Sequence, residues 1–211
     1  MPEHDSDHIA DIHHELHSHL PPEPALRAKA LESLLVEKGL VDPAAVDAWV
    51  DAYANDIGPR NGARVVARAW SDPAFHEKLL ADAPQAVQDL GYDQAHLIAV
   101  ANSEQTHNLV VCTLCSCYPT GLLGMPPAWY KMAAYRARAV REPRTVLAEF
   151  GVELGTDVQV KVWDSTAELR YLVVPQRPAG TEGWDEDRLA ALVTRNAMIG
   201  THRDLAAGSG D

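Results

Sequence analysis

The chain has 211 residues, of which 46% are hydrophobic and 23% are charged, a composition that is ordinary for a globular protein. Its formal net charge of −12 argues against nucleic acid as a partner, because phosphate binding needs a basic face. The sequence has no apolar run of membrane-spanning length, and its amino terminus is acidic and His-rich, so we expect neither a membrane span nor a secretory signal. A chain of this length can bury one sizeable core, or a core with an appended arm.

The amino-terminal segment 1–24 is rich in histidine, acids and proline. Its histidines are His4, His8, His13, His14, His17 and His19. A metal-gathering tail is one interpretation, but we favour a disordered or loosely helical extension, because flexible tails need not form a site. At the other end, residues 205–211 are expected to be flexible.

Helical spacing of apolar residues dominates residues 25–91. Gly39 predicts the end of one helix, while Asp42-Pro43 and Asp72-Pro73 predict the starts of later ones, because aspartate caps helix amino termini and proline fits their first turn. A break between helices is expected at 58–62. Amphipathic helices in series suggest an arm that packs on a partner subunit, with burial within this chain as the alternative.

The hydrophobic period changes in the second half of the chain. Strands are expected at 97–101, 108–111, 158–162 and 169–174, and helices at 143–150 and 186–196. The third strand alternates valine with polar residues and is expected to be half-buried, with the fourth strand as its neighbour. The predicted class is therefore α+β, with a helical arm at 25–91 and a small mixed α/β domain at 92–204 that carries a cysteine metal loop.

All the cysteines of the chain lie in one short stretch, Val110-Val111-Cys112-Thr113-Leu114-Cys115-Ser116-Cys117. Cysteines used as core filler would not cluster in this way. The stretch follows an apolar run and precedes a turn rich in proline and glycine. Cysteine usage of this reduced type also favours the cytoplasm.

The spacing allows one metal ion to bind both sulfur and nitrogen atoms of this loop. If the sulfurs of Cys115 and Cys117 bind, the backbone nitrogens of Ser116 and Cys117 lie within chelating reach, and Cys112 can supply an axial sulfur. The sixth position stays open for water or substrate, as in a catalytic site. Three thiolates and two deprotonated amides favour a trivalent ion, so iron(III) and cobalt(III) fit and tetrahedral zinc fits poorly.

Other uses of the cysteines fit their number and spacing to different degrees. A disulfide framework is disfavoured, because the cysteine count is odd and the neighbours are too close for unstrained bridging. An iron–sulfur cluster usually needs a fourth cysteine. A zinc site made of the three cysteines and His107 is the main competitor on spacing alone.

The cysteine stretch, followed by Leu122-Leu123-Gly124-Met125-Pro126-Pro127-Ala128-Trp129-Tyr130-Lys131, resembles the metal-binding segment of the nitrile hydratase alpha subunit family. Residues 58–70, 167–171 and 175–183 are also similar to that family. Threonine after the first cysteine accompanies cobalt in the family, so Thr113 implies cobalt(III), with iron(III) as the alternative. The resemblance also implies oxidation of Cys115 to sulfinic acid and of Cys117 to sulfenic acid.

The resemblance implies that the chain helps to hydrate a nitrile to its amide. The metal would polarise the nitrile or lower the pKa of a bound water, or a Cys117 sulfenate would attack the nitrile carbon; the residues leave these routes open. Cys115, Ser116 and Cys117 are the implied catalytic residues. The family draws arginines from a beta subunit, so the expected partners are a beta-type subunit in a hetero-oligomer, a small-molecule nitrile and an activator or metallochaperone.

The chain departs from the family beside the loop, where Thr120-Gly121 stands in place of the usual Trp-Pro. Threonine removes a large apolar wall and glycine is expected to loosen the backbone. We therefore expect a larger or more polar pocket at Tyr118, Thr120 and Gly121, suited to a bulky heteroaromatic nitrile as in toyocamycin nitrile hydratase. Refilling of the space by the partner subunit is the alternative, and an aromatic at position 118 is more often packing.

Two other functions are compatible with a cysteine loop of this kind. Thiocyanate hydrolase has a metal subunit with a similar loop, and it would yield carbonyl sulfide rather than an amide. A non-catalytic zinc- or cobalt-binding module would instead enclose its ion fully.

Overall fold

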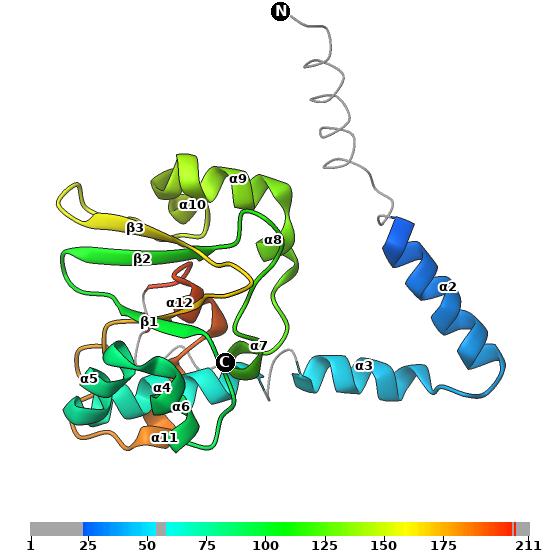
Figure 1. Ribbon diagram of the computed structural model, residues 1–211, viewed down its shortest axis with the longest axis horizontal. Coiled ribbons are helices and arrows are strands. Elements are labelled where there is room, and N and C mark those ends of the chain that lie inside the picture. Colours follow the sequence, from blue (N-terminus) through cyan, green and yellow to red (C-terminus); the bar gives the residue numbers. More distant parts are fainter. Residues whose placement is uncertain (1–22, 54–57, 204, 206–211) are drawn as a thin grey trace, which may run out of the picture. The chain divides into compact units, whose positions relative to one another are not determined.

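The computed structural model describes residues 23–53, 58–203 and 205 (Figure 1). The expected His-rich tail, except Glu23 and Pro24, and the expected flexible carboxy terminus, except Leu205, lie outside the described residues. The chain divides into two compact units, Met1–Val50 and Asp51–Asp211. Among the described residues, no helix is both long enough and apolar enough to cross a membrane.

The first unit contains helix α2 (Glu23–Glu37) and most of helix α3 (Pro43–Asp51). Gly39 follows α2 with a φ of 65°, and the Asp42 carboxylate accepts a hydrogen bond from the Ala44 backbone at 3.0 Å, so both predicted boundaries are confirmed. Neither helix buries a residue, and Trp49 remains 69% exposed. The docking of these helices on a partner stays a prediction.

Three further helices, α4 (Gly58–Ser71), α5 (Pro73–Ala81) and α6 (Ala83–Asp89), belong to the second unit together with the strands. Apolar residues of α4, such as Val65 and Val66, are fully buried in the core. We expected a helical arm that ran to residue 91. The compact unit instead begins at Asp51, because α4, α5 and α6 bury their apolar faces within this chain.

The expected break at 58–62 is wrong, because α4 already begins at Gly58. Its glycines serve close packing instead. A Cβ at Gly58 would lie 2.0 Å from the Cα of Gly124, and a Cβ at Gly62 would lie 2.7 Å from Leu123 Cδ2. The absence of side chains therefore lets α4 approach helix α7 (Thr120–Leu123), which follows the cysteine stretch.

Two parallel pairs of strands form the sheets. Strand β1 (Leu97–Ala101) pairs with β4 (Arg170–Val174), and β2 (Thr106–Val111) pairs with β3 (Gln159–Asp164), which lies beside it in Figure 1. All four expected strands are confirmed. The expected pairing of β3 with β4 is wrong. The alternation of apolar and polar residues indicates which face of a strand is buried, and not which strand lies next to it.

Asn108 in β2 connects the two sheets through its side chain. Its amide nitrogen donates to the carbonyl of Ala101 at 2.8 Å, and its amide oxygen accepts from the Trp163 indole at 2.8 Å. The first bond reaches the end of β1 and the second reaches β3. This bonded network holds β2, the strand that leads into the cysteine stretch.

The remaining helices are α8 (Ala128–Lys131), α9 (Ala133–Arg141), α10 (Pro143–Glu149), α11 (Glu186–Leu192) and α12 (Arg195–Ile199). The helix expected at 143–150 is confirmed. The single helix expected at 186–196 is wrong, because Val193 is extended and the Thr194 hydroxyl caps a new helix by accepting from the Ala197 backbone.

Gly200 is predicted to be essential for stability. It has a φ of 95°, and a Cβ there would lie 2.0 Å from the carbonyl oxygen of Asn108. Gly200→Ala should lower the free energy of unfolding by about 2–4 kcal/mol, since it adds backbone strain and a clash with β2. Gly151→Ala is the matched control, because Gly151 has a φ of 80° but open space around it. Equal losses in denaturant unfolding would contradict the role of the close approach.

Candidate metal centre

The cysteine loop, residues 112–117, begins where β2 ends. Beside it, β3 ends at Asp164, and the Ser165 backbone donates to the carbonyl of Val111 at 2.7 Å. Cys112 is buried, Cys117 is half-buried and Cys115 is exposed. The loop therefore starts in the core, at the carboxyl ends of β2 and β3, and its later cysteines lie nearer the surface.

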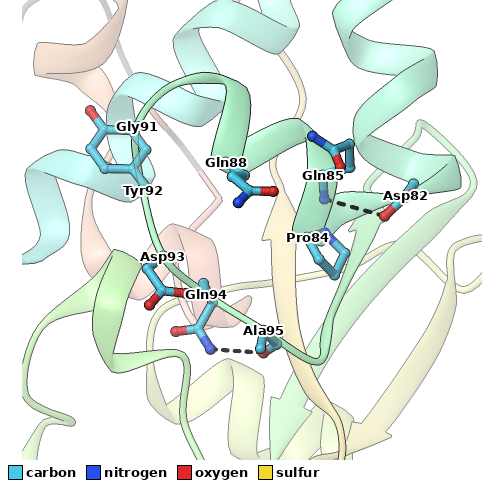
Figure 2. Close-up of a pocket in the computed structure, with 9 residues that line it drawn as sticks. All are labelled: Asp82, Pro84, Gln85, Gln88, Gly91, Tyr92, Asp93, Gln94 and Ala95. Atoms are coloured by element: carbon cyan, nitrogen blue, oxygen red, sulfur yellow. Dashed lines mark hydrogen bonds between the residues drawn. The ribbon is translucent and has the colours of Figure 1, made fainter.

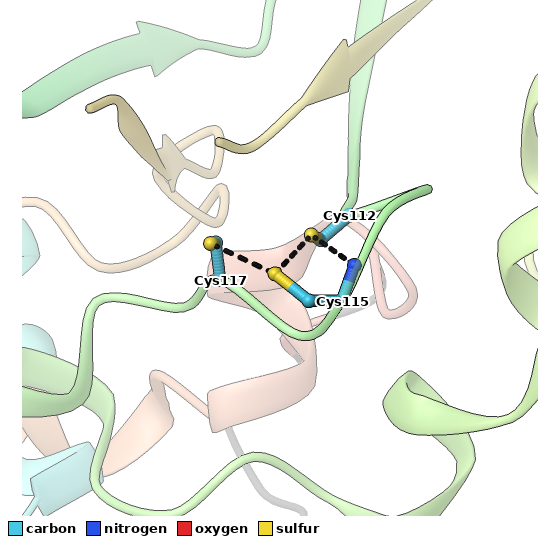
Figure 3. A group of neighbouring side chains, drawn as sticks. All are labelled: Cys112, Cys115 and Cys117. Atoms are coloured by element: carbon cyan, nitrogen blue, oxygen red, sulfur yellow. Dashed lines mark hydrogen bonds between the residues drawn. The ribbon is translucent and has the colours of Figure 1, made fainter. Parts of the chain in front are cut away.

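The three sulfur atoms converge, as the spacing predicts (Figure 3). The Sγ of Cys115 lies 3.5 Å from that of Cys112 and 3.2 Å from that of Cys117, and all three atoms lie within 4.8 Å of one another. The backbone N–H of Cys115 donates to the Cys112 sulfur at 3.3 Å. This set of soft sulfur donors fits a thiolate-binding transition metal such as cobalt or iron.

The thiols differ in how readily they lose a proton. Hydrogen bonds from the side chains of Cys117 and Cys112, and then from the backbone N–H groups of Ser116 and Cys117, lower the pKa of Cys115 to about 7. Burial, together with the neighbouring Cys115, raises the pKa of Cys117 to about 12. One thiolate is therefore stabilised by the loop itself, whereas several thiolates together need a cation.

Asp164 anchors the first half of the loop. Its carboxylate accepts from the Thr113 backbone at 2.9 Å and from the Thr113 hydroxyl at 2.6 Å. Both bonds fix the residue that directly follows Cys112. Sequence reasoning missed Asp164, although a signal existed, because this acidic residue closely follows the strand predicted at 158–162.

Two further side chains hold the second half of the loop through its carbonyl groups. The Tyr130 hydroxyl donates to the carbonyl of Cys117 at 3.0 Å, and Arg136 Nη1 donates to the carbonyl of Cys115 at 2.7 Å. Tyr130 is fully buried and packs edge-on against Tyr118, with ring centroids 5.2 Å apart. The sequence holds no local signal for either contact, since both residues lie on helices that follow the loop.

His107 does not join the sulfur cluster. Its Nε2 lies 2.7 Å from the carbonyl oxygen of Gly200, which accepts the hydrogen bond, and burial lowers the pKa of the imidazole. In the described part of the chain, the group of ligand atoms at this site consists of the three cysteine sulfurs. The alternative zinc site of three cysteines and His107 is therefore wrong.

The residues expected to line a substrate pocket have different environments. Tyr118 is 5% exposed and Thr120 is exposed. Gly121 is not loosened as expected, because its N–H donates to Gln94 Oε1 at 3.1 Å and its carbonyl accepts from Asn61 Nδ2 at 3.2 Å. A Cβ at Gly121 would lie 2.5 Å from a backbone oxygen, so the segment is closely packed there.

A cavity of about 460 Å³ lies beyond this segment, between α6 and the loop that follows it (Figure 2). It is lined by Asp82, Pro84, Gln85, Gln88, Gly91, Tyr92, Asp93, Gln94 and Ala95. Gln94 connects the two regions, because it also bonds to Gly121. The cysteines are not part of the lining, so this cavity is separate from the sulfur cluster.

Comparison with known proteins gives a concordant result. The family profile described as nitrile hydratase, alpha chain, matches residues 22–202. The alpha subunit of the high-molecular weight cobalt-containing nitrile hydratase from Rhodococcus rhodochrous is 55% identical over 183 residues, which cover 85% of this chain and 90% of the relative. The gamma subunit of thiocyanate hydrolase from Thiobacillus thioparus is 43% identical over 185 residues, covering 81% of this chain and 76% of that subunit.

Among solved structures, a double mutant of the Fe-type nitrile hydratase from Comamonas testosteroni Ni1 is similar, with a TM-score of 0.74 and 41% identity. The match covers 91% of this chain and 97% of that one. Sequence, fold and the converging sulfurs therefore agree, and the chain belongs to the nitrile hydratase alpha-chain family.

Proposed function

We propose that this chain is the metal-carrying subunit of a nitrile hydratase that converts a nitrile to its amide at a cobalt(III) centre. The observation that carries the proposal is the convergence of the three sulfurs at the end of β2, with Cys115 exposed. A site of this kind keeps its donors on one side and leaves access for a substrate.

The proposed ligands are the sulfurs of Cys112, Cys115 and Cys117 and the backbone nitrogens of Ser116 and Cys117. Both backbone N–H groups contribute to the lowered pKa of the Cys115 thiol, which supports their orientation toward its sulfur. When bound, the trivalent ion supplies a Lewis acid for nitrile or water. Exposed Cys115 and half-buried Cys117 suit the proposed sulfinic and sulfenic acids, because oxidation advances further where access is greater.

Cobalt is preferred to iron for two reasons. The relative with 55% identity is named cobalt-containing, whereas the Fe-type enzyme is 41% identical. Thr113 also follows the cobalt pattern of the family. Its hydroxyl and N–H both bond to Asp164, so the residue that distinguishes the two patterns is part of the loop's support.

A beta-type subunit is the proposed partner in a hetero-oligomer. Leu114 at the tip of the loop is 81% exposed, and Met125 and Met132 are also exposed. Large apolar side chains that remain exposed in and after the loop are expected where another chain covers the surface. The partner would also supply further cations to the anionic sulfur site. An activator or metallochaperone and a cytoplasmic location belong to the same proposal.

Metal content provides the main test. The chain, co-expressed with a beta-type subunit in cobalt medium, should hold about one cobalt per alpha chain and form amide from nitrile. Cys117→Ser should lose both properties. Ser116→Ala is the matched control and should keep the metal, because the proposed ligand at that position is the backbone nitrogen. Elemental analysis that finds zinc in tetrahedral sulfur ligation would instead support the non-catalytic module.

Thiocyanate hydrolysis remains the second candidate, favoured by the 43% identity to a thiocyanate hydrolase subunit. The same purified complex separates the two activities. Amide from a nitrile supports our proposal, whereas carbonyl sulfide from thiocyanate, without amide formation, would support the second candidate.

Asp164→Asn should reduce the cobalt content and activity by about tenfold, as expected for a group that supports a metal loop. Asparagine replaces one of the two accepting oxygens of Asp164 with an NH2 group, which cannot accept a hydrogen bond from Thr113. Asp157→Asn is the matched control, because Asp157 is an exposed aspartate that precedes the same strand. Elemental analysis and amide production measure the effect, and equal behaviour of the two variants would rule out the anchoring role.

A bulky, heteroaromatic nitrile is the proposed substrate class. The supporting observation is that Thr120 is exposed beside the loop, where an indole would occupy more space. Thr120→Trp should lower the rate on a large heteroaryl nitrile relative to the rate on acrylonitrile. Thr145→Trp, which places the same ring on exposed helix α10, controls for a surface indole. An unchanged ratio of the two rates in Thr120→Trp would contradict the proposed substrate class.

A further inference from the structure

Arg136 joins helix α9 to the centre of the cysteine loop. Its Nη1 donates to the carbonyl oxygen of Cys115 at 2.7 Å. The helix is itself fixed to β2, because the Tyr135 hydroxyl donates to the carbonyl of Val110 at 2.7 Å. The Tyr135 ring also packs against Trp129 of α8, with ring centroids 4.9 Å apart. Arg136 is therefore presented to the loop by a rigid support.

The carbonyl that Arg136 holds belongs to a particular peptide group. The C=O bond of Cys115 and the N–H bond of Ser116 point in opposite directions within one planar trans peptide. When Arg136 binds the oxygen, the Ser116 N–H therefore points away from the guanidinium. The Ser116 backbone N–H is accordingly one of the groups that lower the pKa of the Cys115 thiol.

Arg136 also brings a positive charge to an anionic donor set. The other side chains that anchor the loop, Asp164 and Tyr130, are not cationic. In the part of the chain that the structure describes, no acidic side chain forms an ion pair with Arg136, and its Nε is buried without a hydrogen-bond partner. Its charge is therefore not neutralised by a carboxylate, and it lies at the Cys115 carbonyl of the loop.

We propose that Arg136 is a positioning residue of the metal centre: it orients the Cys115–Ser116 peptide so that the Ser116 nitrogen faces the sulfurs, and its charge offsets that of the thiolates. This inference rests on the proposed function, and it assigns to the alpha chain a cation that acts on the site from within the same subunit. Arg136 touches a ligand-bearing peptide and not the substrate.

The test uses the complex co-expressed with a beta-type subunit at limiting cobalt. Arg136→Met, which removes both the bond and the charge, should contain about tenfold less cobalt per alpha chain than wild type. Arg136→Lys should recover part of the loading, because it keeps the charge. The sulfur-to-cobalt absorption bands of the residual metal should shift in Arg136→Met, a change that altered folding alone would not cause.

Arg141→Met is the matched control, because Arg141 is an exposed arginine at the end of the same helix; it should load cobalt as wild type does. If Arg136→Met does not assemble, Arg136→Gln decides, since it keeps an N–H donor and removes the charge. Wild-type cobalt loading and absorption bands in the assembled variant would overturn the inference. A wild-type complex without cobalt or iron would overturn the proposed function instead, so the two failures are distinguishable.

Discussion

The parallel pairing of β2 with β3 is the constraint on which the site depends. Parallel neighbours end at the same edge of a sheet, and the register places Val111 opposite Asp164. The cysteine loop therefore begins beside the Asp164 carboxylate, which accepts hydrogen bonds from Thr113, the second residue of the loop. A slip of one residue would turn the Asp164 side chain to the other face of the sheet and remove this support.

The loop is held by several modest contacts rather than by one strong contact. A typical intramolecular hydrogen bond contributes about 0.5–1.5 kcal/mol, so the bonds from Asp164, Tyr130 and Arg136 matter through their combined effect on loop geometry. They support the loop in the conformation in which its three sulfurs converge. The raised pKa of Cys117 means that its thiolate form is disfavoured in this cluster. Binding of a cation to the thiolates would offset that cost.

Sequence reasoning succeeded where the determining interactions are local. The spacing of the cysteines brought their sulfurs into one cluster, and Asp72 caps α5 as its pairing with Pro73 predicts. It failed where the cause lies in tertiary packing. Gly58 lies in a helix and leaves room for the close approach of Gly124, and the partner of β3 is a strand that lies far away in the sequence. The contact of Arg136 with the loop was invisible for the same reason.

The Thr120–Gly121 departure illustrates how local chemistry and packing combine. A proline at position 121 would have no N–H to donate to Gln94, and a Cβ there would approach the backbone oxygen of Asp93 to 2.5 Å. The glycine is thus matched to the segment between α6 and β1, and not to the metal loop alone. Because this segment holds Gly121, it also sets the position from which the neighbouring Thr120 side chain projects. Under the proposed function, the size of the accepted nitrile would then depend on residues 93–94 as well as on the residue at position 120, because the same segment fixes the backbone on which both loop positions lie.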